Sequence, residues 1–136
     1  MKLRRRTVLA VAYLDLDGFK GINDRYGHDA GDRLLKALAG HMSHALREVD
    51  TLARLGGDEF VAIYTDLPSV EASLPLLSRL LAAVSEVVQL DSLAVKVSAS
   101  LGVTFYPQDD VADADQLLGQ ADQAMYQAKQ MGKNRY

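Results

Sequence analysis

The chain has 136 residues, 49% of them hydrophobic, which suits one domain with its own core. The absence of cysteine excludes disulfides and thiolate metal sites and fits a reducing cytosol. The net charge of -3 excludes a general attraction to nucleic acid or to anionic membranes. We therefore expect a single cytoplasmic domain over residues 1–136. Because the chain starts and stops abruptly around its predicted elements, we also expect it to be cut from a longer signalling protein that is cytoplasmic or membrane-anchored.

The first predicted element is a strand over residues 8–14, which are continuously apolar and favour a central strand buried on both faces. A basic cluster at residues 1–6 precedes this run, as in a signal peptide. However, the run meets Asp15 and Asp17 at once, and no small-residue cleavage site follows. It is also too short to span a membrane, so we expect a buried strand entered from a solvated basic edge.

Two helices follow this strand. Asp17 is suited to cap a short helix over residues 18–26, which Gly27 ends. The second helix is longer and carries apolar residues at helical spacing. This stripe consists of Leu34, Leu35, Leu38, Met42, Ala45 and Leu46.

A β-hairpin comes next, because the turn 56–59 begins with two glycines and separates the apolar runs 51–55 and 60–64. A third helix opens after Leu67, and Pro75 inside it indicates either a late start or a kink. Its predicted stripe consists of Leu74, Leu77, Leu81, Val84 and Val88.

The last two elements are a strand and a helix. Residues 96–105 alternate between apolar and mainly polar side chains, as in a strand with two different faces. The final helix carries Leu117, Leu118, Ala121, Met125 and Ala128, and it closes near Gly132. The order βααββαβα predicts an α+β domain with a mostly antiparallel central sheet flanked by helices.

Acidic residues stand at two unusual places. Asp15 ends a buried strand, where a charge is costly unless it is paired or bound to metal. Gly56 and Gly57 would let a ligand approach the hairpin backbone closely, and Asp58 follows them. If the hairpin lies beside the first strand, Asp15 and Asp58 converge on one hard cation such as magnesium.

Lys129 and Lys133, predicted at i and i+4 on one face of the last helix, would neutralise phosphates. Acids with a metal on one side and lysines on the other suit phosphoryl transfer. Taken singly, each feature also has a plain interpretation. Asp17 is a helix cap, the glycine-acid string is a solvated turn, and the lysines are solvated residues favoured by a helix C-terminus. An EF-hand is excluded, because Lys20 and Tyr26 occupy loop positions six and twelve.

Together these strings resemble the GGDEF domain of diguanylate cyclases, in family order and over nearly the whole chain. The matching strings are LDLDGFK at 14–20, IND at 22–24, YGHDAGD at 26–32, RLGGDEF at 54–60, SASLGV at 98–103 and ADQAMYQAK at 121–129. The resemblance implies a fold similar to the palm of nucleotidyl cyclases and polymerases.

The resemblance implies a role for each matching acid at the hairpin. Asp15 and Asp58 would hold magnesium or manganese with help from the carbonyl of Leu16. Asp58 would also help to deprotonate the attacking hydroxyl, and Glu59 would support the metal site. The implied catalytic residues are therefore Asp58, Glu59 and Asp15.

The resemblance also implies a GTP site. Asn23 and Asp32 would read the guanine edge, since a carboxylate accepts from both N1 and the 2-amino group, which adenine cannot satisfy. The plain alternative for these two residues is turn and first-turn helix chemistry. The full implied substrate-binding set is Phe19, Lys20, Asn23, Asp32, Gly56, Gly57, Lys129 and Lys133.

In this family each domain binds one GTP, and two domains face each other as a homodimer to form cyclic di-GMP and pyrophosphate. Arg47 and Asp50 form an RxxD string at the spacing of the family's inhibitory product site. Arg47 would pair with phosphate or stack on guanine, and Arg79 would join it. The family usually has arginine at the position of Lys133, so we expect phosphate to bind more weakly here. The helix that supports dimers before the first strand is nearly absent.

Two other functions stay open at this point. One is a non-catalytic sensor that binds GTP or cyclic di-GMP and regulates a neighbouring phosphodiesterase or other output domain. Degenerate domains of that kind usually lose the hairpin acids or glycines, which this chain keeps. The other is a polymerase-like or different nucleotidyl cyclase palm, against which the complete GGDEF and RxxD strings argue.

Overall fold

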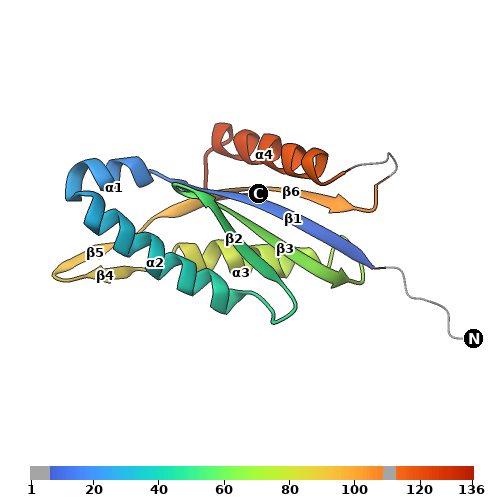
Figure 1. The fold of residues 1–136 in the computed structure, drawn as a ribbon, viewed down its shortest axis with the longest axis horizontal. Coiled ribbons are helices and arrows are strands. Elements are labelled where there is room, and N and C mark those ends of the chain that lie inside the picture. The colour runs from blue at the N-terminus through green and yellow to red at the C-terminus, as the bar shows by residue number, and fades with distance from the viewer. Residues whose placement is uncertain (1–6, 109–112) are drawn as a thin grey trace, which may run out of the picture.

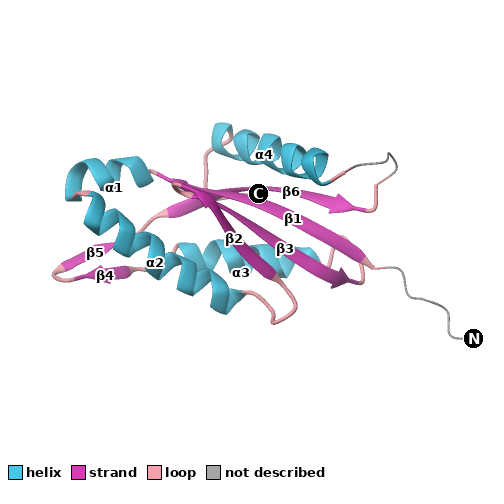
Figure 2. Cartoon of the chain, viewed as in Figure 1, coloured by secondary structure: helices cyan, strands magenta, loops and turns pink. Residues whose placement is uncertain are grey.

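The computed structural model describes residues 7–108 and 113–136 and has one central antiparallel sheet with helices on both faces (Figure 1, Figure 2). The elements are β1 (Val8–Asp17), α1 (Phe19–Tyr26), α2 (His28–Ala45), β2 (Thr51–Gly56), β3 (Glu59–Leu67), α3 (Ser73–Val84), β4 (Val88–Leu90), β5 (Leu93–Val95), β6 (Ser98–Tyr106) and α4 (Ala114–Gln130). The predicted basic edge at residues 1–6 lies outside the described residues.

The central sheet has the strand order β2-β3-β1-β6, so β1 lies in the middle and pairs antiparallel with β3 and β6. This register places Asp15 opposite Glu59 on one side and opposite Ser100 on the other. The end of β1 therefore meets the tip of the β2–β3 hairpin, which is the arrangement on which a shared site of Asp15 and Asp58 depends. The predicted α+β class with a mostly antiparallel sheet is confirmed.

The two faces of the sheet are covered differently, as Figure 1 shows. Alternate residues of β1, including Leu14 and Leu16, join α2 and α3 in the larger core. The remaining residues of β1 face α4, where Val11 packs with Leu117 and Ala121. Helix α4 lies directly on β6, since a Cβ atom added at Gly102 would stand 1.8 Å from the Ala121 carbonyl oxygen. The polar face predicted for β6 is therefore covered by α4 and is not solvated.

The segment after α3 differs from the prediction. A two-stranded hairpin, β4 with β5, precedes β6, so Val88 belongs to β4 and not to a helical stripe. Helix α3 begins at Ser73, which confirms a late start and leaves Pro75 in its first turn, where proline is tolerated. Leu74 is exposed, so its place in the predicted stripe was wrong. Strands of three residues are too short to show the alternation by which strands are recognised.

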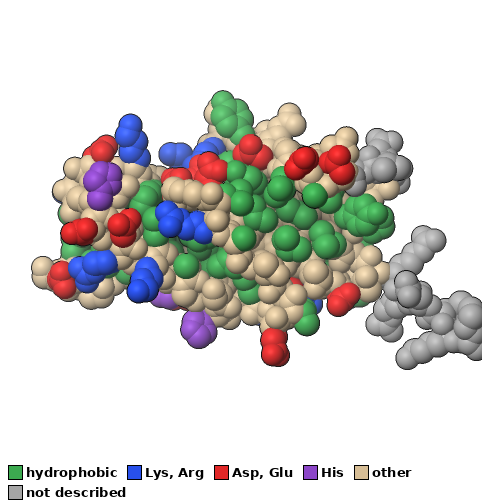
Figure 3. Space-filling model, in the orientation of Figure 1, with side chains coloured by type: hydrophobic (Ala, Val, Ile, Leu, Met, Phe, Trp, Pro, Cys, Tyr) green, Lys and Arg blue, Asp and Glu red, His purple; other side chains and the backbone are tan. Residues whose placement is uncertain are grey.

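Charged and apolar side chains are concentrated on different parts of the surface. In Figure 3 charged side chains gather at the end that carries α1 and the β4–β5 hairpin, whereas apolar side chains dominate over the strands. Among the described residues, no helix is both long and apolar enough to cross a membrane.

Candidate active site

The candidate site lies where β1 ends beside the β2–β3 turn. The backbone N–H of Leu16 donates to the carbonyl of Asp58 at 3.1 Å, which fixes the turn against the strand. Gly56 and Gly57 both have positive φ, at 150° and 51°, so the tight tip depends on residues without a Cβ atom. Asp58 is thereby held next to Asp15.

The carboxylate of Asp15 is poorly compensated. Its side chain is 20% exposed, and its Oδ1 is buried without a hydrogen-bond partner in the described part of the chain. Burial, followed by the nearby charge of Asp58, raises the pKa of Asp15 to about 6, although Lys129 acts in the opposite direction. Two neighbouring carboxylates with too little positive charge form an environment that favours a bound cation.

A hard divalent cation fits this donor set. In residues 7–108 and 113–136, no group of three His, Cys, Asp or Glu side chains is placed to hold a metal. The protein therefore offers Asp15 and Asp58, and other ligands must complete the shell. Magnesium usually binds in this way, through one or two carboxylates together with substrate phosphates and water. The unpartnered oxygen of Asp15 is the specific observation that supports the fit.

Asp17 has a different role from the predicted one. Helix α1 has Gly18 at its N-cap and receives no side-chain cap, so the prediction that Asp17 caps it was wrong. Asp17 instead ends β1, where burial alone would raise its pKa but hydrogen bonds lower it overall. The donors are the Ser98 hydroxyl at 2.6 Å, the Ser100 hydroxyl at 2.8 Å, Lys129 Nζ at 2.9 Å and the Asn134 N–H at 3.2 Å. Asp17 thus ties α4 and the C-terminal residues to β1 and β6.

The two predicted phosphate lysines lie in different settings. Lys129 Nζ stands 2.9 Å from Asp17 Oδ1 and 3.5 Å from Asp15 Oδ2, so its charge is fixed at the acidic site. Helix α4 ends at Gln130, and Lys133 follows it with a φ of 65°. The prediction that both lysines share one helical face was therefore wrong, because the chain leaves the helix before Lys133.

The Tyr13 hydroxyl donates to the carboxylate of Glu59, a contact that the sequence analysis missed. Tyr13 lies two residues before Asp15 on the same face of β1, so strand alternation is the signal that would have identified it. The hydrogen bond to Glu59, with burial second, raises the pKa of Tyr13. Glu59 is therefore held by the sheet next to the hairpin tip.

A cavity lies between α2 and the β2–β3 hairpin. This cavity of about 400 Å³ is lined by Asp32, Leu35, Lys36, Ala39, Arg54 and Phe60. Arg54 Nε donates to the Gly57 carbonyl at 3.0 Å, which joins the pocket wall to the tip. Asp32, one of the two residues predicted to read guanine, lines this cavity, and so does Lys36, one helical turn further along α2, which the sequence did not single out. Its spacing from Asp32 was the available signal.

Asn23 lies in α1, beside the start of α2. Its side-chain oxygen is buried without a hydrogen-bond partner among the described residues. It also fills the space above Gly31, where an added Cβ atom would stand 1.7 Å from it. An unpartnered buried acceptor is costly in a protein without a ligand. Of the other predicted substrate residues, Phe19 is buried and Lys20 is exposed at the start of α1.

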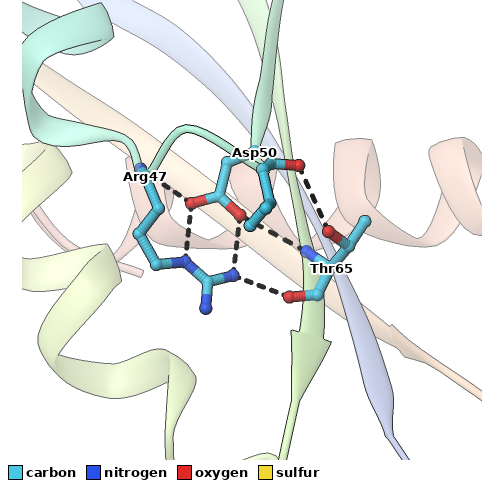
Figure 4. A network of polar contacts seen from close by, with 4 residues as sticks. Arg47, Asp50 and Thr65 are labelled. Carbon is cyan, nitrogen blue, oxygen red and sulfur yellow. Dashed lines mark hydrogen bonds and ion pairs between the residues drawn. The ribbon is translucent and has the colours of Figure 1, made fainter.

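The RxxD residues form a self-contained network at the other end of β3 (Figure 4). Arg47 Nε and Nη2 donate to the two carboxylate oxygens of Asp50 at 2.9 and 2.7 Å, and Nη2 also donates to the Thr65 carbonyl at 2.7 Å. The Asp50 side chain is fully buried. Burial would raise the pKa of Asp50, but the hydrogen bonds from Arg47 lower it overall. The remaining nitrogen of Arg47, Nη1, carries no dashed line in Figure 4.

Arg79 lies near this network. Its charge and that of Arg47 both act on Tyr64, whose pKa is nevertheless raised, mainly by burial and then by Asp50. The Tyr64 hydroxyl is buried and has no hydrogen-bond partner within the described ranges. Arg79 also lines a cavity of about 270 Å³ with residues of α2. The structure therefore brings Arg79 toward Arg47 and Asp50, and Tyr64 is a neighbour that the sequence did not indicate.

Comparison with known proteins identifies the family. The family model described as "Diguanylate cyclase, GGDEF domain" matches residues 1–135. The chain is 42% identical over 127 residues to the bifunctional diguanylate cyclase/cyclic di-GMP phosphodiesterase MucR of Pseudomonas aeruginosa, covering 93% of this chain and 18% of MucR. The chain thus spans less than a fifth of that relative's length.

Two solved structures have the same fold. The GGDEF domain of YfiN, also called TpbB, from Pseudomonas aeruginosa superposes with a TM-score of 0.90 at 39% identity, covering 96% of this chain and 81% of that one. The GGDEF domain of DgcB from Caulobacter crescentus, in complex with c-di-GMP, superposes with a TM-score of 0.84 at 27% identity, covering 95% and 76%. The match of the family model, supported by these likenesses, shows that the chain belongs to the GGDEF family of diguanylate cyclase domains.

Proposed function

We propose that this domain is an active diguanylate cyclase that condenses two GTP molecules into cyclic di-GMP and pyrophosphate. The observation that carries the proposal is the poorly compensated carboxylate of Asp15, which lies next to Asp58 and Lys129 and close to a pocket lined by Asp32. The carboxylates suit a metal, the lysine suits a phosphate, and the pocket suits a base. Because GTP is an intracellular nucleotide, the proposal requires a cytoplasmic location.

Asp15 and Asp58, with the Leu16 carbonyl, would hold a magnesium or manganese ion. When bound, such an ion neutralises the charge of the substrate phosphates and relieves the repulsion between the two carboxylates. Asp58 lies at the exposed tip of the hairpin, where its carboxylate would accept the proton of the attacking hydroxyl. Glu59, held by Tyr13, would support the shape of this tip.

The remaining residues would bind and orient GTP. The carboxylate of Asp32 would accept from N1–H and the 2-amino group of guanine, and the buried oxygen of Asn23 offers a further acceptor. Lys20, Lys129 and Lys133 would hold the triphosphate, with Lys129 already fixed by Asp17. The glycines of the tip would let the nucleotide cross the hairpin closely, next to the backbone that follows Phe19.

The reaction requires two domains that face each other as a homodimer. Each 3′-hydroxyl oxygen attacks the α-phosphorus of the GTP on the opposite domain, and each attack forms one phosphodiester bond and releases one pyrophosphate. Two such steps close the ring of cyclic di-GMP. The dimer supplies proximity, and the fixed charges stabilise the phosphate oxygens. One domain alone provides half of the active site, which fits a piece of a longer signalling protein.

We also propose that the product inhibits the enzyme through Arg47, Asp50 and Arg79. Three donor positions of Arg47 are used inside the protein, and the Nη1 group remains for a phosphate or guanine acceptor. Arg79 adds a second positive charge near Tyr64. The complex of the DgcB domain with c-di-GMP supports this part of the proposal by similarity.

The test is an assay of the domain fused to a dimerising coiled coil, incubated with GTP and magnesium and analysed for cyclic di-GMP by chromatography. We expect product from the fusion and a loss of about a hundredfold or more with Asp58→Ala. The matched control is Glu71→Ala, which removes an exposed acid that follows the end of β3 opposite the hairpin tip. Added cyclic di-GMP is expected to slow the fusion, and Arg79→Met is expected to weaken this inhibition.

A folded, dimeric fusion that binds GTP but forms no product would contradict the cyclase proposal. That result would favour a sensor domain that regulates a neighbouring output domain. Equal product from Asp58→Ala and from the unmodified fusion would remove Asp58 from the mechanism.

A further inference from the structure

We propose that Lys36 is a specificity residue of the guanine pocket and donates to the O6/N7 edge of the base, while Asp32 accepts from the N1 and 2-amino groups. This inference rests on the proposed binding of GTP. It adds a positively charged donor to the two acceptors already proposed, Asp32 and Asn23, and this donor lies on the same helix as Asp32.

The position of Lys36 follows from the geometry of α2. Asp32 and Lys36 are four residues apart, so their side chains are neighbours on one face of the helix. Both line the cavity of about 400 Å³ that Phe60 closes on the side of the sheet. Both are exposed to solvent, whereas Leu35 between them is buried. A flat base in this cavity would therefore meet an acid and a lysine along one edge and apolar side chains on its face.

The charge of Lys36 is available to a ligand. In the ranges that the structure describes, Lys36 forms no ion pair, although its neighbour Arg33 pairs with Asp91 at 3.0 Å. The other cation of the pocket, Arg54, already donates to the hairpin backbone at 3.0 Å. Of the two cations that line the pocket, Lys36 is therefore the one that forms no ion pair with another described residue and donates to none of their backbone groups.

The two side chains together match guanine and oppose adenine. Guanine presents acceptors at O6 and N7 and donors at N1 and the 2-amino group. A lysine can only donate, and an ionised carboxylate can only accept. Adenine has a donor amino group at position 6 and an acceptor at N1, so it would place a donor against Lys36 and an acceptor against Asp32. A carboxylate alone would recognise the N1 and 2-amino donors but not the O6 and N7 acceptors.

The experiment measures binding of nucleoside diphosphates to the chain by calorimetry in magnesium buffer. GDP, 7-deaza-GDP, 6-thio-GDP and ADP are suitable probes, because a diphosphate has no pyrophosphate to release and so cannot react. We expect Lys36→Met to weaken GDP binding about tenfold. The same change should reduce the preference for GDP over at least one of the two modified guanines, and over ADP. Arg33→Met removes the same charge from the adjacent position and is expected to leave these ratios unchanged.

The outcomes separate this inference from the proposed function. If the unmodified chain does not prefer GDP to ADP, the guanine site itself is wrong. If it does prefer GDP, but Lys36→Met weakens all four nucleotides by one factor or has no effect, Lys36 does not read the base and the inference is overturned. Inosine diphosphate, which lacks the 2-amino group, serves as a fifth probe: if the variant still prefers GDP to it, Asp32 still reads the N1 and 2-amino groups.

Discussion

Asp15 and Asp50 lie near opposite ends of β3, and their surroundings differ in an instructive way. The Asp50 side chain is fully buried, yet both its oxygens accept hydrogen bonds from Arg47. Asp15 is less buried, yet one of its oxygens has no hydrogen-bond partner in the described residues, and Asp58 adds a like charge beside it. The pKa of Asp50 is lowered and that of Asp15 is raised.

The difference shows that partners, and not burial alone, decide what a carboxylate contributes. Both oxygens of Asp50 have partners without a ligand, so we expect the removal of Asp50 to destabilise the fold whether or not the pair also binds product. We expect Asp15 to lower the stability of the chain when no cation is bound, so its position is better explained by binding than by folding. A motif residue can therefore be structural, functional or both, and its hydrogen bonds help to distinguish these cases.

The largest expected change in the free energy of unfolding concerns the pair of Asp50 and Arg47. Asp50→Ala leaves Arg47 without its partner, and breaking such a pair costs about 3 kcal/mol of unfolding free energy. This cost lies at the lower end of the range for broken buried ion pairs, because the Arg47 side chain is 33% exposed. Urea denaturation followed by circular dichroism measures it, with Glu48→Ala as an exposed acidic control. An unchanged midpoint for Asp50→Ala would show that the network does not stabilise the fold.

At Asp15, in contrast, we expect a substitution to raise the free energy of unfolding. Asp15→Asn removes a charge whose pKa of about 6 shows that its ionised form is unfavourable in the folded chain. In EDTA at pH 7.5 we expect the variant to gain about 1 kcal/mol of unfolding free energy. Magnesium should raise the melting temperature of the unmodified chain and leave that of the variant unchanged. A variant that is less stable in EDTA would mean that Lys129 already compensates Asp15.

The smallest expected effect concerns pH and Asp50. Because the folded-state pKa of Asp50 lies below 3.8, its contribution is fully present above the unfolded pKa and is lost as pH falls through the lower folded value. The difference in unfolding free energy between the unmodified chain and Asp50→Asn should be about 1 kcal/mol at pH 6 and shrink below pH 4. Urea midpoints measured for both proteins at several pH values give this difference. A difference that stays constant down to pH 3 would rule out a contribution from the charge of Asp50.

Much of the fold was predictable because its signals are local. The apolar run of β1 and the glycine turn between β2 and β3 identified the centre of the sheet. The β4–β5 hairpin was not predictable, since each strand has only three residues. Lys133 was misplaced because the helix ends at Gln130, although Gly132, with a φ of 123°, is a usual signal for such an end.

The sequence by itself determined the family, the α+β class and the residue types of the candidate site, because these depend on motifs and periodicity along the chain. Tertiary structure decided which charges are compensated. Asp17 receives its hydrogen bonds from Ser98, Ser100 and Lys129, more than 80 residues away, so its role could not be read from its neighbours in sequence. Asp15 and Asp50 differ for the same reason. The stability of a buried charge depends on the groups that the fold places around it, and the linear sequence does not specify those distances.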